Sequence, residues 1–267
     1  MQRVLFFLFA LYFLSSCGGS ENPPTGAEDN SNPPPPVLSY NIVKVYPHDT
    51  SSYTEGLIWY NNELYESAGS YNKSKLFKSD IATAKASNTV KLDDKYFGEG
   101  IAILNDKIYQ LTYVEHKVFV YDLKTFQKIK EMEWPYEGWG MTTNSKELII
   151  STGSSNIYFV NPDDFKLKST KQVSDNIGPV NAINELEYFN GFVYANIYGS
   201  DVILKIDPSN GHVIGNINLP GIIKQYAPGF TPDDEEVLNG IAWDSIGKKM
   251  YITGKLWPNI FEVQMEP

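Results

Sequence analysis

Cysteine, arginine and histidine are scarce in this chain of 267 residues. Cys17 is the single cysteine, Arg3 is the single arginine, and the three histidines are His48, His116 and His212. One cysteine forms neither an intramolecular disulfide nor a cysteine-based metal site, and the histidines lack the close spacing of zinc ligands. A zinc enzyme is therefore not expected. Bidentate recognition of phosphate or carboxylate by guanidinium is also not expected in the body of the chain.

Positive charge is also in short supply. The chain has 22 Lys and Arg residues against 32 Asp and Glu residues, and its formal net charge is −10. A nucleic-acid-binding protein needs a cationic face to neutralise phosphates, and an acidic surface repels a polyanion. We therefore expect no nucleic-acid partner.

The N-terminus carries an apolar run at residues 4–14, behind Arg3. The run is shorter than a membrane span of about 20 residues, and a short run behind a positive charge is typical of a secretory signal. It ends in Leu-Ser-Ser-Cys-Gly at residues 14–18, which resembles a bacterial lipobox, so we predict a signal peptide at residues 1–16 and lipidation of Cys17. The alternative is a free cysteine near an ordinary cleavage site.

Residues 17–37 are rich in Pro, Gly, Ser and Asn, which predicts a flexible linker behind the lipid. The expected location is the cell envelope, either at the periplasmic face of the outer membrane or at the cell surface. The lipid anchor would be the only contact with the membrane.

The rest of the chain repeats a short marker five times. The markers begin at residues 55, 99, 139, 184 and 239, and they read Glu-Gly-Leu-Ile, Glu-Gly-Ile-Ala, Trp-Gly-Met-Thr, Asn-Glu-Leu-Glu and Asn-Gly-Ile-Ala. A second apolar segment follows each marker in phase, and further segments that alternate or run apolar come after it. Four short strands in a unit of about 40 to 45 residues are typical of a β-propeller blade.

We therefore predict an all-β fold, a five-bladed β-propeller of four-stranded antiparallel blades over residues 38–267. The last repeat ends after its third strand, whereas a strand-like segment at residues 40–46 stands alone before the first marker. We expect this N-terminal strand to complete the last blade and close the ring. An open β-sandwich is the alternative, but it would not require a fixed recurrence.

The first strand of each propeller blade lines the central channel, so the markers predict a site at one end of it. The polar residues that they bring together are Glu55, Glu99, Asn184, Glu185 and Asn239. Aromatic residues at the same end are Tyr53, Tyr113, Trp139, Tyr198 and Trp257. Apolar walls with a few convergent polar groups are typical of a site for a small molecule or a peptide terminus. The alternative is a polar, water-filled channel without a catalytic role.

Six blocks of the sequence resemble a known family. They are Tyr-Thr-Glu-Gly-Leu at 53–57 behind Pro-His-Asp at 47–49, Phe-Gly-Glu-Gly-Ile at 97–101, Glu-Gly-Trp-Gly-Met at 137–141, Asn-Glu-Leu-Glu-Tyr at 184–188, Leu-Asn-Gly-Ile-Ala at 238–242 and Thr-Gly-Lys-Leu-Trp-Pro at 253–258. In this order they are similar to the signature blocks of the plant and bacterial type of glutaminyl-peptide cyclotransferase, over residues 40–264. The resemblance implies a five-bladed propeller that converts an N-terminal glutamine to pyroglutamate and releases ammonia.

The resemblance also implies roles for individual residues. Glu99 would be the proton shuttle, and Asn184 and Lys255 would bind the carboxamide and stabilise the oxyanion. The expected substrate-binding residues are Tyr53, Glu55, Tyr113, Trp139, Tyr198 and Trp257. No cofactor is required, because the α-amine of the substrate is itself the nucleophile. The expected substrates are peptides or proteins that begin with glutamine.

The chain departs from the family pattern at a few positions. Tyr113 and Tyr198 stand where the family more often has Trp, and Thr152 stands where an Asp is usual. Tyrosine keeps an aromatic face but shortens the wall, so we expect altered substrate preference or efficiency. Glu55, where the family accepts Gln or Glu, would raise the pKa of Glu99 if the two carboxyls are close.

Two other functions stay open. One is a non-catalytic binding module of the envelope, which the departures at positions 113, 152 and 198 favour. The other is a propeller hydrolase of the lactonase kind, which would depend on a metal held by Asp, Asn and Glu in the channel. A structural cation in the channel is also open. The sequence carries no sign of oligomerisation, and we expect a monomer.

Overall fold

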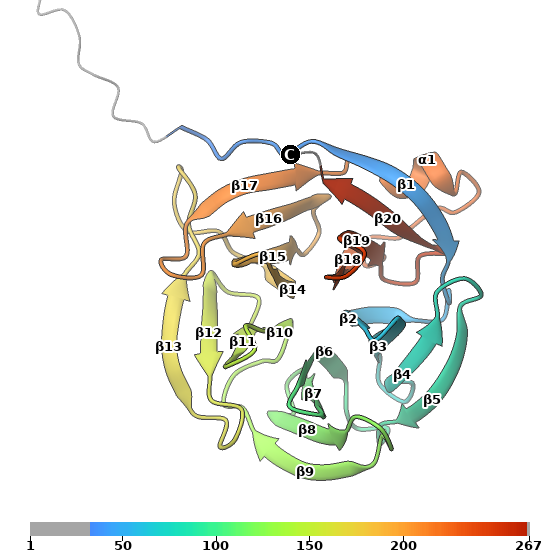
Figure 1. Ribbon diagram of the computed structural model, residues 1–267, viewed down its shortest axis with the longest axis vertical. Coiled ribbons are helices and arrows are strands. Elements are labelled where there is room, and N and C mark those ends of the chain that lie inside the picture. Colours follow the sequence, from blue (N-terminus) through green and yellow to red (C-terminus); the bar gives the residue numbers. More distant parts are fainter. Residues whose placement is uncertain (1–32, 266–267) are drawn as a thin grey trace, which may run out of the picture. The chain divides into compact units, whose positions relative to one another are not determined.

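The computed structural model describes residues 33–265 and contains five four-stranded antiparallel sheets arranged around a central channel (Figure 1). The first blade consists of β2 (Tyr53–Tyr60), β3 (Glu63–Gly69), β4 (Lys75–Asp80) and β5 (Lys85–Lys91). The second consists of β6 (Gly98–Leu104), β7 (Lys107–Thr112), β8 (Lys117–Asp122) and β9 (Lys128–Glu133). The third consists of β10 (Met141–Thr143), β11 (Leu148–Ser151), β12 (Asn156–Val160) and β13 (Leu167–Gln172). The last two blades are β14 (Ile183–Phe189), β15 (Phe192–Ile197), β16 (Val202–Ile206) and β17 (Val213–Asn218), then β18 (Leu238–Asp244), β19 (Lys249–Gly254), β20 (Asn259–Met265) and β1 (Tyr40–Pro47). The predicted five-bladed β-propeller is confirmed.

The N-terminal strand closes the ring as predicted. Strand β1 pairs with β20 in antiparallel register from Tyr40 opposite Met265 to Pro47 opposite Asn259, and it is the outermost strand of the last blade. The chain then passes directly into β2, the innermost strand of the first blade (Figure 1). The hydrogen bonds of one sheet therefore hold the two ends of the propeller together.

Tight hairpins set the register between the first and second strands of the blades. Asn61 and Asn62 join β2 to β3, and Asn105 and Asp106 join β6 to β7, all four with positive φ. Two consecutive residues with positive φ are typical of type I′ turns, whose twist matches that of the flanking strands. Asn and Asp tolerate this conformation better than other side-chain-bearing residues.

Five apolar clusters lie between neighbouring blades, one at each seam of the ring. At the seam of the first two blades, for example, Leu76 packs in one cluster with Ile108, and at the closing seam Leu64 packs with Tyr251. The other three clusters join the second blade to the third, the third to the fourth, and the fourth to the fifth. Apolar burial thus holds each blade to both neighbours.

The channel itself contains two buried carboxyls of β14 that bind across it. Glu185 accepts hydrogen bonds from the backbone N–H of Leu57 at 3.2 Å and of Ile241 at 2.8 Å, which belong to the first and last blades. Glu187 accepts the N–H of Trp243 at 2.9 Å and the hydroxyl of Thr142 at 3.2 Å. Burial raises the pKa of both glutamates, that of Glu187 to about 8.

The connection between β17 and β18 is longer than the others and contains the single helix described in residues 33–265, α1 (Ile222–Tyr226). This insertion explains the longer interval before the last marker. None of the described helical structure is long and apolar enough to span a membrane. The predicted signal peptide, Cys17 and the linker up to residue 32 lie outside the described residues.

Candidate active site

The marker residues lie at irregularities of the inner strands. The register between first and second strands shifts between Thr54 and Gly56 in β2, between Gly98 and Ile101 in β6, and between Ile183 and Leu186 in β14. A fourth shift occurs in β18, whereas β10 begins within its marker, at Met141. A β-bulge breaks the alternation of side chains and re-aims the inserted residue. Four blades thus have a register shift at the marker, and Glu55, Glu99 and Asn184 at three of these shifts line one pocket.

Glycine at the second position of the marker allows the inner strands to approach one another. A Cβ atom on Gly140 would lie 2.1 Å from the carbonyl oxygen of Asn184 on the next blade. In the fourth blade the corresponding position is Glu185, whose side chain reaches across the channel instead.

The pocket at this end of the channel encloses about 380 Å³. It is lined by Tyr53, Glu55, Tyr71, Phe97, Glu99, Tyr113, Trp139, Asn184, Tyr198 and Lys255. The structure therefore brings together all three residues predicted to be catalytic and five of the six predicted to bind substrate. Asn239 lies behind the pocket, where its amide donates to Glu55 Oε2 at 3.4 Å and to the Thr54 carbonyl at 2.8 Å.

Trp257 is the predicted substrate-binding residue that the pocket lining does not include. Its side chain is buried in the last blade, where its indole N–H donates to the Glu236 carbonyl at 2.7 Å and its ring packs edge-on against Phe261. Gly254 makes room for the ring, because a Cβ atom there would lie 2.3 Å from it. The aromatic ring therefore supports the turn that carries Lys255 and does not form the wall.

Two lining residues were not among those predicted. Phe97 precedes Glu99 by two residues, as Tyr53 precedes Glu55, and this repeated spacing could have indicated it. Tyr71 follows the second strand of its blade, as Tyr113 and Tyr198 follow theirs. Aromatic residues that follow the second strand of a blade thus form part of the pocket wall.

Phe97 lies at the centre of a ring cluster. Its ring meets those of Tyr53, Tyr71 and Tyr113 at centroid distances of 6.2, 5.4 and 6.0 Å. Across the pocket, Trp139 packs edge-on against Tyr198 at 5.8 Å and donates its indole N–H to Glu137 at 3.1 Å.

A buried lysine pairs with a buried glutamate at the pocket base. Lys255 Nζ donates to Glu55 Oε1 at 2.5 Å, and each residue is less than 5% exposed. The same ammonium lies 4.3 Å from the centroid of the Tyr53 ring, within the range of a cation–π contact. Two hydrogens of the ammonium remain beyond the one given to Glu55.

Glu99 and Glu55 form a buried carboxyl pair in which the pKa of both groups is raised. Burial raises its pKa well above the usual range, the neighbouring Glu55 raises it further, and Lys255 opposes this. Burial also raises the pKa of Glu55, against the effect of Lys255. A hydrogen bond between the two carboxyls favours the protonated form of Glu99 and the ionised form of Glu55. Of the two carboxyls, Glu55 is the one that Lys255 contacts directly, and the pKa of Glu99 is raised both by burial and by Glu55.

Asn184 presents a buried amide that is available to a ligand. Its side-chain oxygen has no hydrogen-bond partner among the described residues, although Asn184 is only 2% exposed. A buried polar atom without a partner is costly unless a ligand or water satisfies it. Its backbone carbonyl is held by the Ser151 hydroxyl at 2.6 Å, which positions the side chain from the neighbouring blade.

Within residues 33–265, no group of three or more His, Cys, Asp and Glu side chains is arranged to hold a metal ion. The pocket offers two carboxyl groups, an ammonium and an amide inside an aromatic wall. Such a set moves a proton and stabilises negative charge on an oxygen atom.

Comparison with known proteins is consistent across sequence and structure. The family model described as glutamine cyclotransferase matches residues 14–265. A glutaminyl-peptide cyclotransferase of Arabidopsis thaliana is 37% identical over 231 residues, which are 84% of this chain and 71% of that protein. The crystal structure of Myxococcus xanthus glutaminyl cyclase matches with a TM-score of 0.81 and 34% identity, over 87% of this chain and 98% of that one.

Proposed function

This chain belongs to the glutamine cyclotransferase family, and we propose that its pocket cyclises N-terminal glutamine with Glu99 as the proton shuttle. It is a glutaminyl-peptide cyclotransferase, an enzyme of the acyltransferase class. The observation that carries the proposed mechanism is the buried arrangement of Lys255, Glu55 and Glu99 at one face of the pocket.

The reaction needs no nucleophile from the enzyme. The α-amine nitrogen of the substrate bonds to the carbon of its own γ-carboxamide, and the tetrahedral intermediate then loses the amide nitrogen as ammonia. The attacking nitrogen gives up one proton and the leaving nitrogen gains one, so the two transfers balance. The enzyme must therefore hold the side chain in a folded geometry and move one proton between two nitrogen atoms.

Glu99 is suited to that transfer. Burial raises the pKa of Glu99, and a carboxyl with a raised pKa is a stronger base than an exposed one, so it is better able to accept a proton and later return it. Attack is assisted by the ionised form, which takes the proton of the attacking amine. Departure is assisted by the acid that results, which protonates the leaving nitrogen.

Lys255 and Asn184 complete the site by acting on the carboxamide. The ammonium of Lys255 is held by Glu55 and faces the pocket, so its remaining hydrogens would stabilise the developing oxyanion. The unpaired oxygen of Asn184 would accept an N–H of the substrate. The aromatic rings would surround the glutamine methylenes and exclude water.

Three further points stay part of the proposal. The chemistry supplies its own nucleophile, so no cofactor is invoked. Lipidation of Cys17 and attachment to the envelope would place the site among exported peptides and proteins. A monomer suffices, because the pocket is lined by residues of one chain.

The purified protein is to be incubated with three peptides that differ only in a first residue of Gln, Asn or Glu, with and without EDTA. Ammonia release and mass spectrometry report cyclisation. We expect conversion of the Gln peptide alone, because only Gln has a carboxamide that closes a five-membered ring with its own α-amine. EDTA should leave this conversion unchanged. Binding of the Gln peptide without ammonia release would overturn the proposal in favour of a binding module, and loss of activity in EDTA would indicate metal-dependent chemistry.

A further inference from the structure

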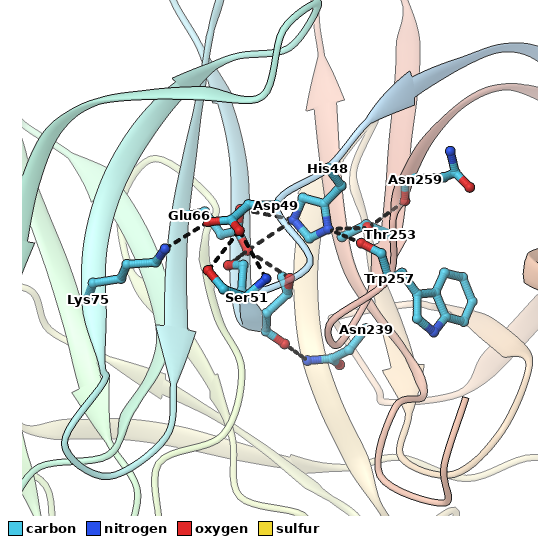
Figure 2. A network of polar contacts seen from close by, with 11 residues as sticks. His48, Asp49, Ser51, Glu66, Lys75, Asn239, Thr253, Trp257 and Asn259 are labelled. Atoms are coloured by element: carbon cyan, nitrogen blue, oxygen red, sulfur yellow. Dashed lines mark hydrogen bonds and ion pairs between the residues drawn. The ribbon is translucent and has the colours of Figure 1, made fainter. Parts of the chain in front are cut away.

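A buried ion pair outside the pocket lining joins the first blade to the last. His48, in the connection from β1 to β2, faces Glu66 of β3, and its Nε2 lies 3.2 Å from Glu66 Oε2. Both side chains are almost completely buried, and neither lines the pocket. Burying two charges is costly, and it is repaid only when further hydrogen bonds satisfy both groups. Figure 2 shows the His48 ring between Glu66 on one side and Thr253 and Trp257 on the other.

The surroundings of the ring require a proton on both nitrogens. Nε2 faces the carboxylate, and Nδ1 lies 2.7 Å from the carbonyl oxygen of Trp257. The Thr253 hydroxyl near Nδ1 donates to the Asn259 carbonyl at 2.8 Å, so it offers only its oxygen to the ring. With oxygen acceptors on both sides, His48 is an imidazolium.

The pKa shifts agree with this geometry. Burial acts to lower the pKa of His48, but Glu66 and the hydrogen bonds outweigh it, and the pKa is raised. Burial acts to raise the pKa of Glu66, but His48 and two hydroxyls outweigh it, and the pKa is lowered. Two further charged groups belong to the surroundings of the pair. Asp49 also raises the pKa of His48, and Lys75 forms an ion pair with Asp49 at 2.9 Å.

Glu66 holds the beginning of the strand that carries Glu55. Its Oε1 accepts the hydroxyls of Ser52 and of Thr54, the latter at 2.7 Å. Thr54 directly precedes Glu55 at the bulge of β2. The carboxylate therefore anchors the backbone from which the Glu55 side chain projects.

His48 holds the turn that carries Lys255. Its ring binds the Trp257 carbonyl, and its backbone N–H donates to the Pro258 carbonyl at 2.9 Å. The N–H of Leu256 donates to the Ser52 carbonyl at 2.9 Å in the same region. Leu256 has a φ of 58°, a conformation that is unfavourable for leucine without such support.

We infer that His48 and Glu66 are positioning residues that set Lys255 against Glu55 in the pocket. Glu66 fixes the strand that bears one partner, and His48 fixes the turn that bears the other. The ion pair thus acts on the reaction through Lys255, without contact with substrate. This inference rests on the role of Lys255 in the proposed function.

A double-mutant cycle on kcat tests the coupling. The variants are His48→Gln, Lys255→Met and the two combined, with Glu66→Gln as a second probe of the pair and Tyr46→Phe as the control. Tyr46 donates its buried hydroxyl to Glu262 at 2.7 Å at the closing seam, and it is not part of the pocket lining. All rates are normalised to the folded fraction of each sample.

We expect His48→Gln to lower kcat about 10- to 100-fold with a smaller change in KM, because a small misplacement of a catalytic group is enough for such a loss. In the Lys255→Met background the same change should have little further effect on kcat, because the residue acts through Lys255. Glu66→Gln should behave like His48→Gln, and Tyr46→Phe should leave kcat unchanged.

An equal fold-loss from His48→Gln in both backgrounds would overturn the inference, as would an unchanged kcat in the folded single variant. A Lys255→Met enzyme with wild-type kcat would instead contradict the proposed function of Lys255. Reductive methylation of Lys255, followed by mass spectrometry, gives a readout that needs no activity. The buried lysine should be protected in the wild type and labelled in His48→Gln and Glu66→Gln. Equal protection in all three proteins would contradict positioning.

Discussion

At the scale of single residues, the chemistry proposed for this protein depends on two buried carboxyls beside one ammonium. Glu55 and Glu99 come from adjacent blades, and Lys255 comes from the last. Burial raises the pKa of both carboxyls, Lys255 opposes this at each of them, and the Glu55 carboxylate raises the pKa of Glu99 further. The pKa of Glu99 therefore depends on Glu55 as well as on burial.

Replacement of Glu55 by Gln tests the effect of Glu55 on the pKa of Glu99. The Glu55 carboxylate raises the pKa of Glu99, and its removal also leaves the charge of Lys255 unopposed, so both effects lower the pKa of Glu99. We expect the acidic limb of the kcat profile to move to lower pH in Glu55→Gln. Measurement of kcat against pH on a Gln-initiated peptide checks it, with exposed Glu133→Gln as the matched control. An unshifted acidic limb would refute the coupling.

Individual site residues were predictable where a repeated motif carried them. Glu99 and Asn184 stand at the same point of their repeats, and the ring topology brings such points together. Phe97 and Tyr71 were missed because aromatic residues are common in propeller cores, and sequence alone does not separate wall from core. Trp257 was predicted to bind substrate, but the close approach to Gly254 that turns its ring into the blade becomes visible only in three dimensions.

At the scale of elements, the bulged inner strand is the unit that makes the site. The strands themselves were predictable from alternation and recurrence, and so was the pairing of the N-terminal strand with the last repeat. The bulges were not, because a register shift depends on hydrogen bonds with the neighbouring strand. In four of the five blades the marker begins with a polar residue, and in four of the five its second residue is a glycine, which has no side chain.

Gly140→Ala tests the need for glycine at the second position of the marker. A Cβ atom there would meet the carbonyl oxygen of Asn184 at 2.1 Å, so β10 and β14 must separate and Asn184 must move. We expect a destabilisation of about 1 to 3 kcal/mol, typical of overpacking, together with a lower kcat. Thermal unfolding and ammonia release measure the two effects.

Gly229→Ala is the matched control for this substitution, because a Cβ atom at that position meets nothing within 4 Å. It should leave both stability and kcat close to the wild-type values. If Gly140→Ala were equally silent, close packing of the inner strands would not be what positions Asn184.

At the scale of the whole molecule, the ring is held by apolar seams outside and by carboxyl groups across the channel inside. Glu187 joins three blades, since it lies on β14 and binds Trp243 of the last blade and Thr142 of the third. This arrangement makes the stability of the ring depend on pH.

The direction of that dependence follows from the pKa of Glu187, which burial raises to about 8 in the folded protein. The folded state binds the proton more tightly than the unfolded state, so the contribution is fully present at low pH. It is lost as pH rises from the unfolded value of about 4.3 through about 8. We expect Glu187→Gln to be more stable than the wild type at pH values above about 8, and this advantage should shrink toward acidic pH. Denaturant unfolding across this range measures it, and parallel curves for the two proteins would contradict the assignment.

The measurement that tests the central claim most directly is kcat of the Glu99→Gln variant on a Gln-initiated peptide, beside the wild type and Glu133→Gln. Gln keeps the size and polarity of the side chain but cannot shuttle a proton. If Glu99 moves the proton, kcat should fall by about 10²- to 10⁴-fold, the range that general acid–base catalysis contributes, while the variant stays folded and Glu133→Gln keeps full activity. A folded Glu99→Gln protein that releases ammonia at the wild-type rate would contradict the account.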